Sequence, residues 1–80
     1  MDKNAIFLVL KEIISSQFGI DKDSIEPGKR WEEDLELDSL DAVDLIISLD
    51  DHIGQKIEPT LFKDAKTVQD LVDLLQPHWK

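Results

Sequence analysis

A single serine, Ser39, stands at the start of a strongly apolar helical pattern, within a stretch of acids and leucines that has the sequence DLELDSLD. Backbone N–H groups in the first turn of a helix have no partner within the helix, and the positive end of the helix dipole favours an anion. A phosphodiester on the Ser39 hydroxyl would be stabilised at such a position. We therefore predict that Ser39 is a covalent attachment point.

Two other roles for Ser39 have to be weighed against attachment. Hydrolytic catalysis would need a base beside the hydroxyl, but the only histidines, His52 and His78, lie near the far end of the same helix and at the C-terminus. We therefore predict no catalytic residue. Serine is also enriched at helix starts for structural reasons alone. Because Asp38 can already cap the helix, Ser39 is left free for attachment.

Apolar periodicity and capping residues predict a small all-α bundle of three main helices plus a short third helix. The first helix covers 5–18, with Asp2 or Asn4 as its cap and Gly19 as its stop. The second covers 39–53 and ends at Gly54. The short helix begins at 58–59 and ends near residue 64. The fourth begins after Thr67, with its inward residues expected to be Val68, Leu71, Leu74 and Leu75.

A long loop between the first and second helices completes the predicted fold, which forms one domain over residues 1–80. Apolar periodicity lapses from 20 to 37, where Pro27 and Gly28 indicate a turn. Structureless loops of this length are uncommon in compact domains, so the loop is expected to be packed down. Its anchors are expected to be Ile20, Ile25, Trp31 and Leu35.

The second helix is apolar around most of its axis. Its polar residues form one narrow stripe, which consists of Asp41, Asp44, Ser48 and Asp51. This pattern predicts that the helix lies at the centre of the bundle, with the stripe as its only strip facing solvent.

Composition excludes several classes of function. The chain has 18 acidic and 9 basic residues and a net charge of -9, which argues against nucleic acid or an anionic membrane and favours a basic protein partner. It has no cysteine, so any sulfur chemistry has to come from an attached group. No segment is apolar enough to span a membrane, and no signal peptide is evident. We therefore expect a cytoplasmic protein, and we expect it to be a monomer. We expect no metal site, because His52 is a lone histidine among acids and would bind divalent ions weakly at best.

The motif Asp38-Ser39-Leu40 resembles the attachment site of the acyl carrier proteins. The similarity extends over nearly the whole chain. It includes the opening amphipathic helix, Trp31 where the family usually has an aromatic residue, the lead-in Glu33-Asp34-Leu35, the following Asp41, and Thr67-Val68 at the start of the last helix.

This resemblance implies a carrier that is a substrate of other enzymes and not itself a catalyst. A phosphopantetheinyl transferase, with its magnesium ion, would move 4′-phosphopantetheine from coenzyme A onto Ser39. The thiol of that arm would carry acyl groups as thioesters, which accounts for the missing cysteine. Asp38 would help to orient the serine and the metal in that reaction, cap the helix, or do both. Leu40 belongs to the same cofactor-binding motif.

The resemblance also implies that acyl-transfer and chain-elongation enzymes read the second helix through basic docking patches. The acids at the matching positions are Asp41, Asp44 and Asp51, and Glu36 adds a charge beside the arm where a glycine is common in the family. A row of acids is more often a plain solvated face, but this row carries a single sign of charge.

Carriers of this family shelter the acyl chain between their helices. Candidate cavity residues here are Val43, Ile46, Ile47, Leu61, Phe62 and Leu71, although residues of these types more often belong to an ordinary core than to a ligand cavity. Bulk at Leu61 and Phe62, and the apolar run 7–9 in the first helix, depart from the family pattern and suggest a specialised carrier or a long cargo.

The sequence therefore favours a carrier for fatty acid or related lipid and polyketide synthesis. Two alternatives stay open. One is an aminoacyl or peptidyl carrier domain, which shares the modified serine. The other is an unmodified acidic helical adaptor that binds a basic protein.

Overall fold

Three α-helices and three short 3₁₀ helices make up the part of the chain that the computed structural model describes, which is residues 2–54 and 56–79. The α-helices are α1 (Lys3–Phe18), α2 (Ser39–Ile53) and α3 (Val68–Leu75). The 3₁₀ helices are η1 (Lys22–Ser24), η2 (Pro59–Asp64) and η3 (Gln76–His78). No strand forms in these residues beyond one isolated backbone bridge between Arg30 and Thr67. The predicted all-α fold is confirmed, with the short third helix in 3₁₀ form.

Capping residues set the helix boundaries. Asp2 accepts a hydrogen bond from the Ala5 backbone N–H at 2.8 Å, so α1 begins at Lys3, two residues before the predicted start. The other candidate cap, Asn4, lies inside the helix. At the C-terminal end, Gly19 adopts a left-handed conformation with φ of 69°, which glycine adopts at little cost. Gly54 ends α2 in the same way, with φ of 81°.

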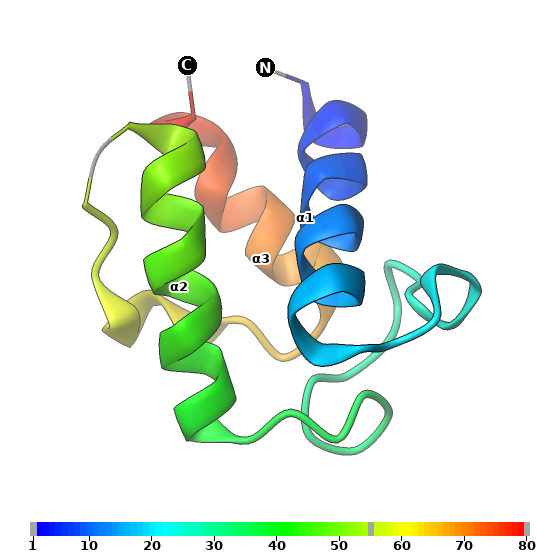
Figure 1. Cartoon of the computed structure of the whole chain (residues 1–80). Helices are drawn as coiled ribbons and strands as arrows, with labels where there is room; N and C mark the ends of the chain where they lie inside the picture. Colours follow the sequence, from blue (N-terminus) through cyan, green and yellow to red (C-terminus); the bar gives the residue numbers. More distant parts are fainter. Residues whose placement is uncertain (1, 55, 80) are drawn as a thin grey trace.

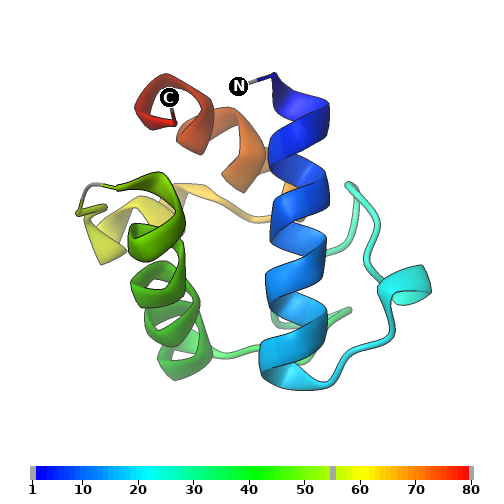
Figure 2. The same ribbon diagram turned by 45° about the horizontal axis from the view of Figure 1, so that its top comes forward.

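α1 and α2 lie side by side, and α3 crosses behind them (Figures 1 and 2). Both ends of the described chain lie at one end of the bundle, and the start of α2 lies at the opposite end (Figure 1). The core gathers apolar side chains from all three α-helices, from the long loop and from the C-terminal Trp79. Of the α3 residues predicted to point inward, Val68, Leu71 and Leu75 are fully buried and Leu74 is half-buried. Val72, which was not predicted to point inward, is also fully buried.

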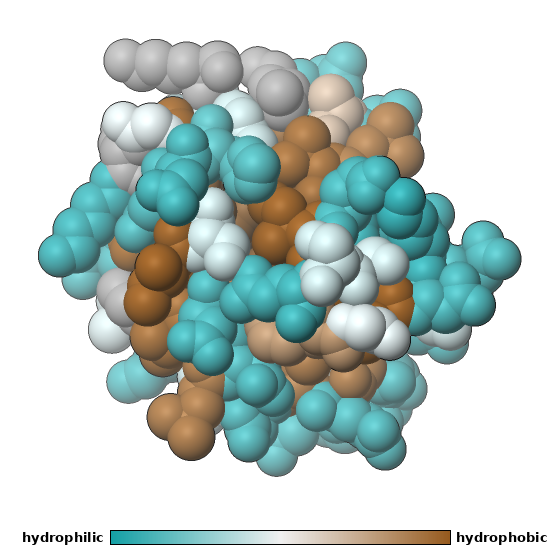
Figure 3. Space-filling model, in the orientation of Figure 1, coloured by the Kyte–Doolittle hydropathy of each residue, from teal (hydrophilic) through white to brown (hydrophobic). Residues whose placement is uncertain are grey.

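The prediction that α2 lies at the centre of the bundle is wrong. Only one of its faces is buried, through Leu45, Ile46 and Leu49. A second apolar face is open to solvent, with exposed fractions of 77% for Leu40, 40% for Val43 and 57% for Ile47. Apolar surface is visible along α2 in the space-filling view (Figure 3). The physical reason is that α2 packs mainly on α1 and η2, which cover one side of it. We call Leu40, Val43 and Ile47 the apolar face of α2.

The polar stripe of α2 is also not purely a solvent-facing strip. The Ser48 hydroxyl donates a hydrogen bond to Gln17 Oε1 at 2.6 Å, which ties α2 to α1. On the same helix, Asp50 Oδ1 accepts a hydrogen bond from the Ile57 backbone N–H at 2.8 Å. Polar side chains of α2 therefore also hold its neighbours in place.

The long loop between α1 and α2 is packed down, as predicted. Ile25, Trp31 and Leu35 are buried, while Ile20 is half-buried. Backbone hydrogen bonds fix the loop to the start of α3. The Val68 N–H donates to the Lys29 carbonyl at 3.0 Å, and the next N–H along α3 donates to the carbonyl of Pro27 at 2.9 Å.

An ion pair fixes the start of α1 to α3. The Lys3 Nζ lies 3.0 Å from Asp73 Oδ1. The hydrogen bond from Lys3, together with one from Gln69, lowers the pKa of the Asp73 carboxyl below its ordinary value. Both partners are about half exposed, so this pair orients the two helices more than it stabilises them.

No helix in the described residues is long and apolar enough to cross a membrane.

Glu36 is the one non-glycine residue of the described chain with a positive φ, at 58°. The left-handed conformation places Cβ close to the backbone and costs about 1–2 kcal/mol for an ordinary L-residue. It stands two residues before the cap of α2, where the sequence resemblance to the carrier family implies a glycine. The backbone turn into α2 therefore uses a conformation that glycine adopts at little cost, and this chain makes the turn with a side chain present.

We predict that Glu36→Gly raises the free energy of unfolding by up to about 1 kcal/mol, because glycine adopts positive φ without the Cβ clash. Glu36→Val should lower it by about 1 kcal/mol, since a β-branched side chain is the least tolerated there. Urea unfolding followed by circular dichroism measures both changes. Glu36→Gln is the control for lost charge and should match the parent chain. Equal stability of the glycine and valine variants would contradict the strain argument.

Candidate functional site

Asp38 and Asp41 form a reciprocal cap at the start of α2. Asp38 Oδ1 accepts hydrogen bonds from the backbone N–H groups of Leu40 at 3.0 Å and Asp41 at 3.1 Å. In return, Asp41 Oδ2 accepts from the backbone N–H of Asp38 at 3.2 Å. Carboxylates at this end of the helix also match the positive end of its dipole. The capping role predicted for Asp38 is present in the structure.

Ser39 is the first residue of α2 and is exposed to solvent. No described residue forms a hydrogen bond with its hydroxyl, because the cap is made by the side chains on either side of it. The hydroxyl is thus accessible and unengaged. A phosphate ester on it would sit at the positive end of the helix dipole. The residues present therefore fit a covalently attached phosphodiester.

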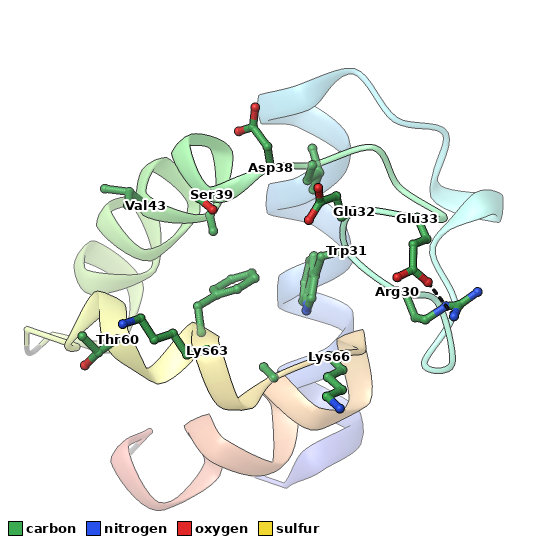
Figure 4. A pocket seen from close by; sticks show the side chains of 14 residues that line it. Arg30, Trp31, Glu32, Glu33, Asp38, Ser39, Val43, Thr60, Lys63 and Lys66 are labelled. Carbon is green, nitrogen blue, oxygen red and sulfur yellow. Dashed lines mark ion pairs between the residues drawn. The ribbon is translucent and has the colours of Figure 1, made fainter.

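A pocket of about 710 Å³ opens beside Ser39, between the start of α2, η2 and the loop that precedes α2 (Figure 4). Its apolar lining includes Trp31, Leu37, Ala42, Val43, Phe62 and Ala65. Its polar lining includes Arg30, Glu32, Glu33, Asp38, Ser39, Thr60, Lys63 and Lys66. A pocket with a mixed apolar and polar lining next to an attachment point is suited to enclose part of an attached chain.

The rim of the pocket carries three basic residues in a chain that is strongly acidic overall. The Arg30 guanidinium pairs with Glu33 and lies 3.6 Å from Asp34 Oδ2. A hydrogen bond from the Arg30 backbone N–H lowers the pKa of Asp34, and the guanidinium adds to that effect. Lys63 and Lys66 are exposed and have no ion-pair partner among the described residues. Two ammonium groups are therefore free to meet an anion or an acceptor at the pocket.

Two aromatic rings meet in the pocket wall. The Trp31 and Phe62 ring centroids lie 4.8 Å apart, with their planes tilted by 55°. Trp31 comes from the long loop and Phe62 from η2, so the contact joins two segments that are distant in sequence. Tilted aromatic pairs of this kind contribute about 0.5–1.5 kcal/mol beyond their buried area.

The structure brings some of the predicted cavity residues to this pocket and not others. Val43 and Phe62 line it. Ile46 and Leu71 are buried in the core and do not line it, and Ile47 points to solvent. The side chain of Leu61 lies outside the described residues. The apolar exposure of Val43 and Ile47 follows from the one-sided packing of α2.

The predicted partner-binding acids differ in their surroundings. Asp44, Asp51 and Glu36 are exposed and have no ion-pair partner among the described residues. Asp41 is half-buried and is engaged in the cap. Leu40, from the attachment motif, is the most exposed member of the apolar face of α2.

Apart from Val43 and Phe62, the pocket residues from outside the attachment motif were not predicted from the sequence to line a cavity. The basic residues Arg30, Lys63 and Lys66 come from two segments more than 30 positions apart. No local pattern signals that the fold brings them to one rim. Trp31 was predicted only as a loop anchor, although its aromatic character was the available signal.

Comparisons with known proteins agree with this site. The family model for the phosphopantetheine attachment site matches residues 9–75. The acyl carrier protein of Lactobacillus acidophilus is 36% identical over 98% of this chain and 98% of its own length. Acyl carrier protein 2 of Ralstonia nicotianae is 37% identical over 95% of this chain and 94% of its own.

One solved structure has a similar fold. A free-standing peptidyl carrier protein from a secondary metabolic pathway of Acinetobacter baumannii superposes with a TM-score of 0.78, covering 92% of this chain and 91% of its own. Its sequence identity is 24%, so this likeness shows the fold alone.

The chain therefore belongs to the family of phosphopantetheine-bearing acyl carrier proteins. The family resemblance inferred from Asp38-Ser39-Leu40 is confirmed, and so is 4′-phosphopantetheine as the prosthetic group. Members of this family are carriers, which are handled in general by phosphopantetheinyl transferases and acyl-handling enzymes.

We predict that Asp38→Ala lowers the free energy of unfolding by about 1 kcal/mol, because two backbone N–H groups of α2 lose their acceptor. Asp38→Asn should lower the free energy of unfolding by only about 0.3 kcal/mol, since an asparagine side chain caps a helix nearly as well as aspartate does. Thermal unfolding of the two variants beside the parent chain measures the difference. An alanine variant as stable as the asparagine variant would show that the cap contributes nothing.

Proposed function

We propose that this chain is an acyl carrier protein whose Ser39 hydroxyl is joined to 4′-phosphopantetheine through a phosphodiester. The observation that carries the proposal is Ser39 itself, exposed and unengaged at the capped start of α2 in a chain of this family. When bound, the arm supplies a terminal thiol that holds acyl groups as thioesters. The chain's own residues present that arm and receive its cargo.

The chain acts as the substrate when it is loaded. The serine hydroxyl attacks the phosphorus of coenzyme A that carries the pantetheine. The diphosphate P–O bond breaks, adenosine 3′,5′-bisphosphate leaves, and the hydroxyl proton passes to a base that, like the activating metal, belongs to a separate phosphopantetheinyl transferase. Asp38 holds the first turn of α2, so that the Ser39 oxygen stays outside the helix and accessible. Its exposed carboxylate is also placed to approach the metal of a bound transferase.

Partner enzymes are proposed to dock on α2. Asp44 and Asp51 offer unpaired exposed carboxylates to basic patches, and Glu36 adds one near the arm. The apolar face of α2 lies on the same helix. Exposed apolar patches of this kind mark surfaces that other proteins cover, so each partner enzyme would bury this face while it is bound. Rim charges mainly set the rate of association and its salt dependence, so docking is expected to be weak, fast and sensitive to salt.

The cargo is proposed to come from fatty acid synthesis or a related lipid or polyketide pathway, which the names of the sequence relatives support. No observation specifically favours the peptidyl alternative, because the peptidyl carrier neighbour is informative for the fold alone. A single carrier domain over 1–80, a monomeric state and a cytoplasmic location are further parts of this proposal.

Incubation with coenzyme A and a broad-specificity phosphopantetheinyl transferase tests the proposal. We expect the intact mass to rise by one phosphopantetheine in the parent chain and to stay unchanged in Ser39→Ala. Ser16→Ala is a matched control that removes another exposed serine and should be loaded normally. An unmodified parent chain would instead favour the acidic adaptor, and loading of Ser39→Ala would move the attachment point elsewhere.

Reversal of the exposed α2 acids tests the docking surface. We predict that Asp44→Lys with Asp51→Lys slows enzymatic loading or acylation by about tenfold at low salt, since steering by opposite charge is lost. Asp41 is left unchanged because its carboxylate also caps α2.

The matched control is Asp23→Lys with Glu26→Lys, which makes the same change in net charge on the long loop. This control should retain most of the parent rate, and the difference between the two pairs should shrink as salt is added. Equal slowing by both pairs would mean that overall charge, and not the α2 surface, governs docking.

A further inference from the structure

Trp31 carries a hydrogen-bond donor that the described fold does not satisfy. Its side chain is only 5% exposed, yet its buried indole Nε1 has no acceptor among the described residues. The residue also lines the pocket beside Ser39. Buried polar groups are nearly always paired in native proteins, so each exception calls for a specific explanation.

The groups around this indole do not supply an acceptor. Phe62, whose ring is centred 4.8 Å away, presents only carbon and is itself half-buried. In Figure 4 the ring nitrogen of Trp31 points toward the end of the pocket where Lys66 lies, while Glu32 and Glu33 lie on the other side of the ring. The ammonium of Lys66, like the indole N–H, donates hydrogen bonds and cannot accept them. This end of the pocket therefore offers hydrogen-bond donors.

A purely hydrocarbon chain in the pocket would leave the indole donor unpaired. A chain that carries a carbonyl oxygen would pair with it, beside the apolar side chains that form part of the pocket wall. The indole nitrogen is buried, so a chain reaches it only if neighbouring side chains move, and the half-buried ring of Phe62 packs directly against Trp31. Phe62 lies on η2, a short 3₁₀ helix, which is a less regular element than the α-helices.

We infer that the Trp31 indole N–H donates a hydrogen bond to a carbonyl oxygen of the chain attached to Ser39, when that chain occupies the pocket. The inference rests on the proposed function and adds the chemical class of the group that the pocket recognises. Three sources share this chemistry. They are an amide carbonyl of the phosphopantetheine arm, the thioester carbonyl that joins the cargo to the arm, and an oxo group on the acyl cargo.

NMR of the indole groups tests the inference, because the chain has only two tryptophans, Trp31 and Trp79. The ¹⁵N-labelled chain is compared in four forms: unmodified, carrying the free arm, carrying a saturated acyl group, and carrying a 3-oxoacyl group of equal length. Trp79→Phe assigns the remaining indole signal to Trp31. Trp79 lies in the core outside the pocket and serves as the internal reference.

We expect the Trp31 indole proton to move downfield on loading, while the Trp79 signal stays in place. A shift in every loaded form identifies the arm amide as the acceptor. A shift in both acylated forms but not with the free arm identifies the thioester carbonyl, and a shift only in the 3-oxoacyl form identifies the oxo group of the cargo. A Trp31 signal unchanged in all loaded forms would overturn the inference.

Trp31→Phe provides a second readout, since it keeps an aromatic ring beside Phe62 and removes the N–H. Loading with the group that shifts the Trp31 signal should raise the melting temperature less in this variant than in the parent chain. An equal rise in both proteins would count against the hydrogen bond.

Intact mass distinguishes failure of the proposed function from failure of this inference. Failure to load Ser39 overturns the proposed function and this inference together, whereas full loading without an indole response overturns this inference alone.

Discussion

The reciprocal cap between Asp38 and Asp41 is the interaction on which the attachment site depends. It satisfies backbone donors at the start of α2 with side chains that flank Ser39, and so leaves the serine hydroxyl without a structural task. A serine that capped the helix itself would have its oxygen committed to a backbone N–H. Here Asp38 and Asp41 cap the helix while the nucleophilic oxygen of Ser39 stays exposed. The helix start is therefore stabilised without using the serine hydroxyl.

One-sided packing of α2 is the second constraint. The helix buries Leu45, Ile46 and Leu49 and leaves an apolar face and exposed acids for other molecules. The core is completed instead by α3, whose four buried residues have no measurable exposure, and by the anchored loop. A carrier that has to meet several enzymes needs such an uncommitted surface, and the fold supplies it by closing the core with a shorter helix.

The sequence was sufficient to predict most helix boundaries, because Asp38, Gly19 and Gly54 act locally through capping and positive φ. It was not sufficient to place α2, since exposed and buried apolar residues look alike in a periodic pattern. The pocket was predicted only in part, through Val43 and Phe62. Its wall joins Trp31 to Phe62, and that pairing depends on how the long loop and η2 meet in space. Glu36 could be flagged as unusual, but its positive φ required coordinates.

The placement of the chain ends has a practical consequence. The two ends of the described chain lie at one end of the bundle, and the start of α2, whose first residue is Ser39, lies at the other (Figure 1). A tag, a fluorophore or a surface tether joined to either end would therefore extend away from the loading site. Immobilised in this way, the protein would keep its serine directed toward the solution, where enzymes could be captured and exchanged in turn.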